Sequence, residues 1–286
     1  MSIDLKVLYP KLINLMLDTV FLVDRDDRIV FVSNACEQLL GYSVEELIGT
    51  LITDYVHPDD LEATRASIVR VMNAQPHVDY HNRYIRKDGG IAYILWSARW
   101  SEELNGRLGV ARDVTALRQA EEKLRFLAHH DPLTQLTNRS LFNDRLESAL
   151  RSARRHQGTL ALLFLDINNF KEINDAYGHS AGDRILCVVA RRLEGCLRDT
   201  DTAARMGGDE FTVLLTEIRS GAVSRKIDQI LAVMAEPLGP EFGDIRMPSC
   251  SIGVACYPAD GEDADSLLSH ADREMYRIKK NRLVIG

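Results

Sequence analysis

Gly207-Gly208-Asp209-Glu210-Phe211 is the stretch that decides how the second half of this chain folds. It joins two apolar runs, at residues 202–206 and 211–215. Glycine adopts positive φ without steric cost, so a Gly-Gly pair between two such runs predicts a two-residue β-hairpin. Two carboxylates directly after a tight turn repel each other unless a cation shares them. The stretch therefore indicates a hairpin beside a metal and a phosphate-bearing ligand.

A second acid follows an apolar run upstream, where residues 159–166 predict a buried strand ending at Asp166. A carboxylate in that place is costly unless it caps a helix or binds a metal. The residues alone leave both readings open. Asp166 could be the N-cap of a helix that starts near Asn169. Alternatively, Asp166 and Asp209 could hold Mg²⁺ or Mn²⁺, with the backbone carbonyl of Ile167 as a further ligand.

The second half alternates helices and strands. The pattern predicts helices over residues 138–157, 181–198, 220–235 and 263–280, and a further strand over 247–257. This order is typical of an α/β domain with a central, mainly antiparallel sheet.

The first half contains short strands at residues 20–24, 28–32, 80–86, 91–100 and 108–113, with a helical patch over 34–40. A charged stretch between the halves places Leu117, Ala120, Leu124 and Leu127 at a/d spacing. This stretch predicts either one amphipathic helix packed on its own domain or a parallel helix pair that links two protomers.

Composition limits the classes of function. A length of 286 residues suggests two domains, and the net charge of −7 argues against a nucleic-acid partner. The five cysteines show no CxxC spacing, so we expect reduced thiols in a cytoplasmic protein. No apolar run approaches 18 residues, so we expect no integral membrane segment.

The hairpin stretch matches the signature of the GGDEF family, the diguanylate cyclases. The resemblance extends to residues 131–134, 166–183, 251–255 and 271–280. The first half resembles a PAS domain, through motifs in order at residues 34–43, 45–49, 57–60, 86–89 and 113–115. Together these imply a two-domain α+β or α/β protein. The expected parts are a PAS sensor domain (1–115) with an antiparallel five-stranded sheet and flanking helices, a signalling linker helix (116–130), and a palm-like GGDEF domain (131–286).

The resemblance implies an enzyme that condenses two GTP into cyclic di-GMP and pyrophosphate across a homodimer. It assigns metal binding to Asp166, Ile167 and Asp209, and catalysis to Asp209, Glu210 and Lys171. It assigns contacts with GTP to Phe170, Asn174, His179, Asp183, Lys279 and Arg282. Asn174 and Asp183 are expected to read guanine. Arg282 stands one position earlier than the family's usual arginine.

Arg198 and Asp201 match the family's RxxD inhibitory site, which binds cyclic di-GMP. The alternative for this pair is a solvated helix-to-strand turn with a local ion pair. Two other functions remain open for the whole chain: a catalytically silent receptor for cyclic di-GMP or GTP, and a dimerising scaffold. The PAS ligand is not identified by the sequence, which lacks the flavin-adduct cysteine motif. Trp96 and Trp100 either line a cavity or pack in the core or an interface.

Overall fold

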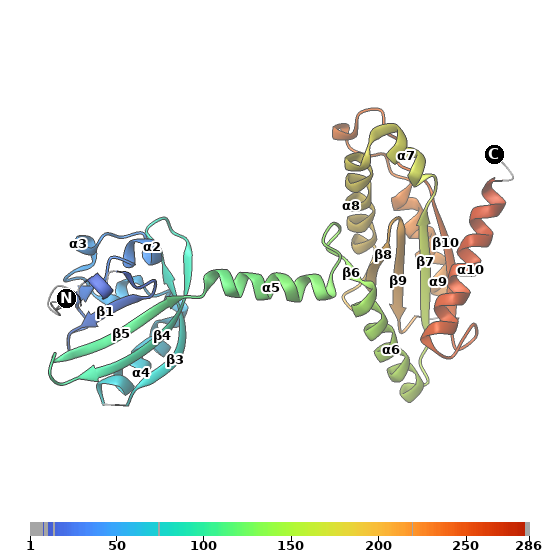
Figure 1. The fold of residues 1–286 in the computed structure, drawn as a ribbon. Coiled ribbons are helices and arrows are strands. Elements are labelled where there is room, and N and C mark those ends of the chain that lie inside the picture. The colour runs from blue at the N-terminus through green and yellow to red at the C-terminus, as the bar shows by residue number, and fades with distance from the viewer. Residues whose placement is uncertain (1–7, 9–10, 14, 74, 219, 284–286) are drawn as a thin grey trace. The chain divides into compact units, whose positions relative to one another are not determined.

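The computed structural model describes residues 8, 11–13, 15–73, 75–218 and 220–283. The chain forms two compact units that divide between Lys123 and Leu124 (Figure 1). Each unit has its own sheet, and each is described separately below.

The first unit is built on a five-stranded antiparallel sheet, as the PAS resemblance implies. Its strand order is β2-β1-β5-β4-β3. The strands are β1 (Thr19–Val23), β2 (Ile29–Val32), β3 (His77–Ile85), β4 (Ile91–Ser101) and β5 (Gly106–Asp113). The helices are α2 (Cys36–Leu40), α3 (Val44–Leu47) and α4 (Leu61–Met72), with 3₁₀ turns at Ile52–Tyr55 and Pro58–Asp60.

The helix α4 is not predicted from the sequence. Only Thr64 and Val71 of its twelve residues are buried, so its apolar periodicity is weak. The helix α5 (Thr115–His129) contains the division between the units. It has no buried residue, and Leu117 and Leu124 are exposed. This exposure does not support the alternative in which the helix packs on its own domain.

The second unit has a sheet of order β10-β7-β9-β8-β6, in which β6 and β8 pair in parallel and the other neighbours antiparallel. Its strands are β6 (Thr137–Asn138), β7 (Leu160–Ile167), β8 (Thr202–Gly207), β9 (Glu210–Thr216) and β10 (Cys250–Tyr257). Its helices are α6 (Arg139–His156), α7 (Phe170–Tyr177), α8 (His179–Gly195), α9 (Ser220–Met234) and α10 (Ala264–Leu283), with a 3₁₀ turn at Pro240–Phe242. The mainly antiparallel sheet is confirmed.

The central strand β7 is buried along its whole length. Leu163 and Leu165 pack into the core that holds the buried residues of α8 and α9, whereas Leu162 and Phe164 pack with those of α6 and α10. Side chains alternate between the two faces of a strand. Asp166 therefore lies on the face that α10 covers.

A glycine allows α10 to lie close to the sheet. A Cβ on Gly253 of β10 would stand 2.0 Å from the carbonyl oxygen of Ala271 and 2.2 Å from the nitrogen of Met275. No side chain fits at that separation. This close approach brings the carboxyl-terminal half of α10 to the end of β7.

Two local expectations are corrected. The hairpin turn consists of Gly208 and Asp209, because Gly207 already pairs with Glu210, and φ is positive at both glycines. Asp166 is not a helix cap, since Asn169 is the N-cap of α7. None of the helices in the described part of the chain combines the length and the apolar character that crossing a bilayer requires.

Candidate active site

Three predicted acids meet at the end of the central strands. Asp166 of β7 and Glu210 of β9 are direct cross-strand partners, and Asp209 precedes Glu210 in the turn. Asp166 is only 7% exposed. Lys279 of α10 reaches it, with Nζ 2.5 Å from Oδ1 of Asp166. The structure thus brings four of the predicted residues together.

Negative charge is crowded in this cluster. Burial raises the pKa of Asp166, and the charges of Asp209 and Asp272 raise it further, while Lys279 acts in the opposite direction. Burial also raises the pKa of Glu210, helped by Asp272, Asp166 and Asp209. Carboxylates that raise one another's pKa are stabilised as anions by a shared cation.

The cluster fits a sparse metal site. Among the described residues, no three His, Cys, Asp or Glu side chains form a group able to hold a metal by themselves. Mg²⁺ needs only one or two carboxylates when substrate phosphates and water complete its shell. Asp166 and Asp209 meet that requirement. The nitrogen of Ile167 donates to the carbonyl of Asp209 at 3.3 Å and so ties the turn to β7.

The hairpin turn is also held from the other side by Arg205. Its guanidinium donates to the carbonyl of Gly208 at 2.7 and 3.0 Å and to the carboxylate of Asp131 at 3.1 and 3.2 Å. Burial would raise the pKa of Asp131, but hydrogen bonds from Thr134 and the ion pair with Arg205 lower it. The motif at residues 131–134 therefore supports the hairpin.

The two predicted guanine readers lie on neighbouring helices. A Cβ on Gly182 of α8 would stand 2.0 Å from Oδ1 of Asn174 on α7. Asn174 therefore packs on the residue that directly precedes Asp183. Oδ1 of Asn174 is buried and has no hydrogen-bond partner among the described residues. Buried acceptors without a partner are rare in native proteins, so this one marks an unusual position.

The other predicted GTP contacts differ in exposure. Lys171, His179 and Asp183 are exposed. Phe170 is 9% exposed and belongs to the hydrophobic core. Arg282 lies in the last turn of α10, and its side chain is outside the described part of the structure.

The predicted inhibitory pair lies between α8 and β8. Arg198 and Asp201 line a hollow of about 270 Å³ together with Arg145. The carboxylate of Asp201 accepts hydrogen bonds from two backbone N–H groups, that of Arg198 at 3.2 Å and that of Thr216 at 3.3 Å. Arg198 is exposed, and no ion pair joins it to Asp201 within the described residues. The alternative of a local ion pair is therefore not seen.

Three features of the site were not predicted from the sequence: Asp272, Gly182, and the link between Arg205 and Asp131. Asp272 precedes Lys279 by seven residues, or about two helical turns, so both lie on one face of α10. With Lys279 assigned to the site, this spacing is the sequence feature that predicts Asp272 beside it. The Gly182 contact depends on the packing of α7 on α8, for which no local pattern exists.

Comparisons with known proteins match one family model to each of the two units. The family model "Diguanylate cyclase, GGDEF domain" matches residues 128–283, and the "PAS fold" model matches residues 29–110. Diguanylate cyclase TpbB of Pseudomonas aeruginosa is 43% identical over 247 residues, which are 86% of this chain and 54% of TpbB. The chain thus spans about half the length of that relative.

Solved structures are similar to the second unit. A form of TpbB comprising only the GGDEF domain is 47% identical, with a TM-score of 0.52 over 54% of this chain and 90% of that one. The coiled coil and GGDEF domain of DgcB from Caulobacter crescentus, in complex with c-di-GMP, is 29% identical. Its TM-score is 0.53, over 59% of this chain and 89% of that one. Since the GGDEF model covers more than half of the residues, this chain belongs to the GGDEF family of diguanylate cyclase domains, and a PAS fold precedes that domain.

Proposed function

We propose that this chain is a diguanylate cyclase, which condenses two GTP into cyclic di-GMP and two pyrophosphates. The observation that carries the proposal is the cluster of Asp166, Asp209 and Glu210 at the ends of β7 and β9, with Lys279 beside it. The name of the relative TpbB supports the same activity.

Asp166 and Asp209 would hold Mg²⁺ or Mn²⁺, with the carbonyl of Ile167 as a further ligand. When bound, the ion neutralises charge on the phosphates and so lowers the barrier to phosphoryl transfer. The raised pKa of Asp166 and the nearness of the other acids support a cation at this place.

The chain's remaining residues bind and orient GTP. The amide of Asn174 and the carboxylate of Asp183 would hydrogen-bond the guanine edge, which adenine does not match. Lys171, Lys279 and Arg282 would contact the phosphates, where positive charge stabilises the transition state. His179 and Phe170 would border the nucleotide, and the buried ring of Phe170 fixes the start of α7.

The reaction joins two nucleotides. The 3′-oxygen of one GTP attacks the α-phosphorus of the other, a new P–O bond forms, and the bond to pyrophosphate breaks. The hydroxyl proton passes to Asp209 or, as the second choice, to Glu210. Each domain holds one GTP, so two copies of the chain must face each other for both attacks to occur.

We infer that α5 joins the two copies as a parallel helix pair and carries the state of the PAS unit to the cyclase unit. The exposed Leu117, Leu124 and Leu127 supply the apolar seam. The DgcB structure, which comprises a coiled coil and a GGDEF domain, supports this arrangement. We place the protein in the cytoplasm, where its GTP substrate is found.

Arg198 and Asp201 would form the inhibitory site for cyclic di-GMP. The exposed guanidinium of Arg198 can form bidentate hydrogen bonds with a phosphate or with a guanine edge. The c-di-GMP in the DgcB complex shows that a similar domain binds this nucleotide.

The test is product analysis of the purified full chain incubated with GTP and Mg²⁺. We expect cyclic di-GMP from the parent chain and none from Asp209→Asn, while Asp228→Asn, on the exposed face of α9, serves as the matched control. Equal product from Asp209→Asn and Asp228→Asn would refute the assignment of Asp209.

A further inference from the structure

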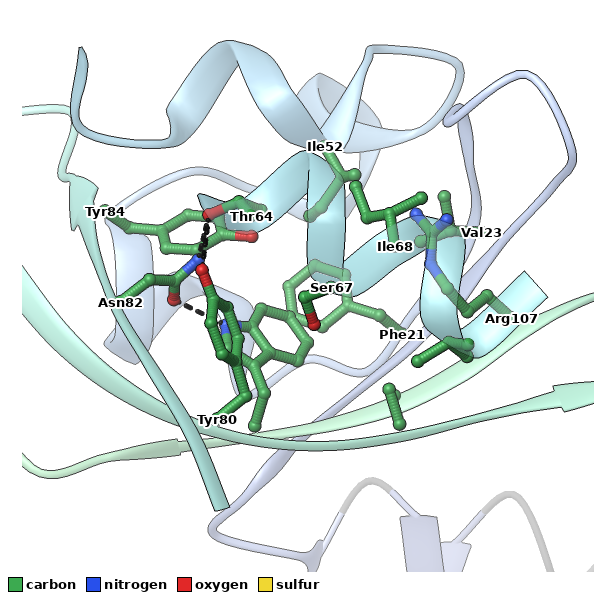
Figure 2. A pocket seen from close by; sticks show the side chains of 14 residues that line it. Phe21, Val23, Ile52, Thr64, Ser67, Ile68, Tyr80, Asn82, Tyr84 and Arg107 are labelled. Atoms are coloured by element: carbon green, nitrogen blue, oxygen red, sulfur yellow. Dashed lines mark hydrogen bonds between the residues drawn. The ribbon is translucent and has the colours of Figure 1, made fainter. Parts of the chain in front are cut away.

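The first unit contains a cavity between its sheet and α4, which Figure 2 shows from close by. Its volume is about 60 Å³. One water requires about 10–15 Å³ by the same measure, so the cavity takes a molecule of roughly four to six non-hydrogen atoms. Most of the wall is apolar and includes Phe21, Val23, Ile52, Ile68, Val71 and Trp96. This wall suits a short hydrocarbon chain.

A buried cation lines the same cavity. Arg107 of β5 is only 7% exposed, and its Nη2 donates to Oδ1 of Asp27 at 2.8 Å. Its Nη1 is buried and has no hydrogen-bond partner among the described residues. Figure 2 labels Arg107 with Val23 and Ile68 among the residues that line the cavity. A buried neutral donor without an acceptor lowers the stability of the fold by about 1–3 kcal/mol, and a charged donor lowers it by more. An acceptor for Nη1 would therefore be stabilising.

The polar groups at the other end of the cavity already satisfy one another (Figure 2). Trp96 donates to Asn82, Asn82 donates to Thr64, and the Thr64 hydroxyl donates to the carbonyl of Asp60. The Tyr80 hydroxyl lies 3.0 Å from that of Thr64 and must be the donor, since the Thr64 proton is engaged. No acid is among the described residues that line the cavity. Arg107 therefore decides which ligand chemistry fits.

We propose that this cavity binds a short-chain monocarboxylate. Nη1 of Arg107 donates to a carboxylate oxygen, and the hydrocarbon part lies against Phe21 and Trp96. Guanidinium and carboxylate carry opposite charges, and both groups are planar, so they pair well. The side chain of Asp27 is 31% exposed, so water weakens the repulsion between its carboxylate and a ligand carboxylate bound to the same guanidinium.

The fluorescence of Trp96 provides the test, because this ring lines the cavity. Trp100→Phe leaves Trp96 as the single tryptophan of the full chain. Butyrate, at constant ionic strength, should change the emission saturably. Butyramide has the same shape without the charge and should bind about tenfold or more weakly. No saturable change with butyrate, or equal affinity for butyramide, would overturn the proposal.

Substitutions in the same background locate the site. Ala98→Leu fills the cavity without removing a charge and should abolish butyrate binding in a chain that still melts cooperatively. Asp27→Asn should tighten butyrate binding severalfold, because it frees the guanidinium. Arg107→Gln should remove the preference for butyrate over butyramide, whereas Arg112→Gln, at an exposed arginine of β5, should keep it. Butyrate binding that persists unchanged in Ala98→Leu would place the ligand elsewhere and refute the assignment.

Discussion

The ammonium of Lys279 lies 2.5 Å from Oδ1 of Asp166, so a residue proposed to bind phosphate is paired with a proposed metal ligand. In the chain without nucleotide, Lys279 places a positive charge beside the acid cluster. We propose that Lys279 and a metal ion compete for Asp166, and that bound GTP would release Asp166 by drawing the lysine to its phosphates.

Lys279→Met tests this competition. Removing the ammonium should tighten Mn²⁺ binding to the nucleotide-free chain about tenfold, or about 1.4 kcal/mol, and raise KM for GTP. Electron paramagnetic resonance of free Mn²⁺ measures the first effect and steady-state kinetics the second. Lys280→Met on the same helix is the control. Weaker Mn²⁺ binding in Lys279→Met would contradict the competition.

Gly182→Ala should impair GTP binding through Asn174. The added methyl group would stand 2.0 Å from Oδ1 of Asn174, so the amide must move. We expect KM for GTP to rise about tenfold, which corresponds to the loss of about one good hydrogen bond to the base. Gly195→Ala is the matched control in α8, because a Cβ there meets nothing within 4 Å. An unchanged KM in Gly182→Ala would show that Asn174 does not contact the nucleotide.

Asp131→Asn should destabilise the cyclase unit in a pH-dependent way. Its pKa is lowered in the folded chain, so its contribution is complete above the ordinary carboxyl value of about 4 and is lost as pH falls through the lowered value. We expect a loss of about 2 kcal/mol at pH 7 that shrinks in acid. Denaturant unfolding at several pH values measures it. A loss that is constant with pH would mean that the charge of Asp131 is not involved.

Arg198→Ala should relieve product inhibition without lowering the initial rate. Arg198 is exposed and precedes β8, whereas the acids of the hairpin follow that strand. Its loss leaves Asp201 bound to two backbone nitrogens. Progress curves with added cyclic di-GMP measure the effect, and Arg191→Ala serves as the exposed-arginine control. An inhibition curve identical to the parent's would exclude this site.

The sequence was sufficient to predict the two-domain organisation, both sheets and the place of Asp166 beside the hairpin that carries Asp209 and Glu210, because these follow from strand patterns and a strong motif. It was not sufficient for Asp272, whose place in the cluster depends on how closely α10 lies on Gly253. The buried Arg107 was also missed, since an arginine in a strand is usually solvent-exposed. In both cases the decisive fact is packing between elements that are distant in sequence.

Measuring cyclic di-GMP and pyrophosphate formed from GTP and Mg²⁺, over a dilution series of the purified full chain, tests the central claim most directly. We expect cyclic di-GMP and pyrophosphate in a ratio of one to two, since two GTP release two pyrophosphates. We also expect the rate per protein to fall on dilution, as the dimer dissociates. GTP left unchanged at all protein concentrations, or converted to a product other than cyclic di-GMP, would contradict it.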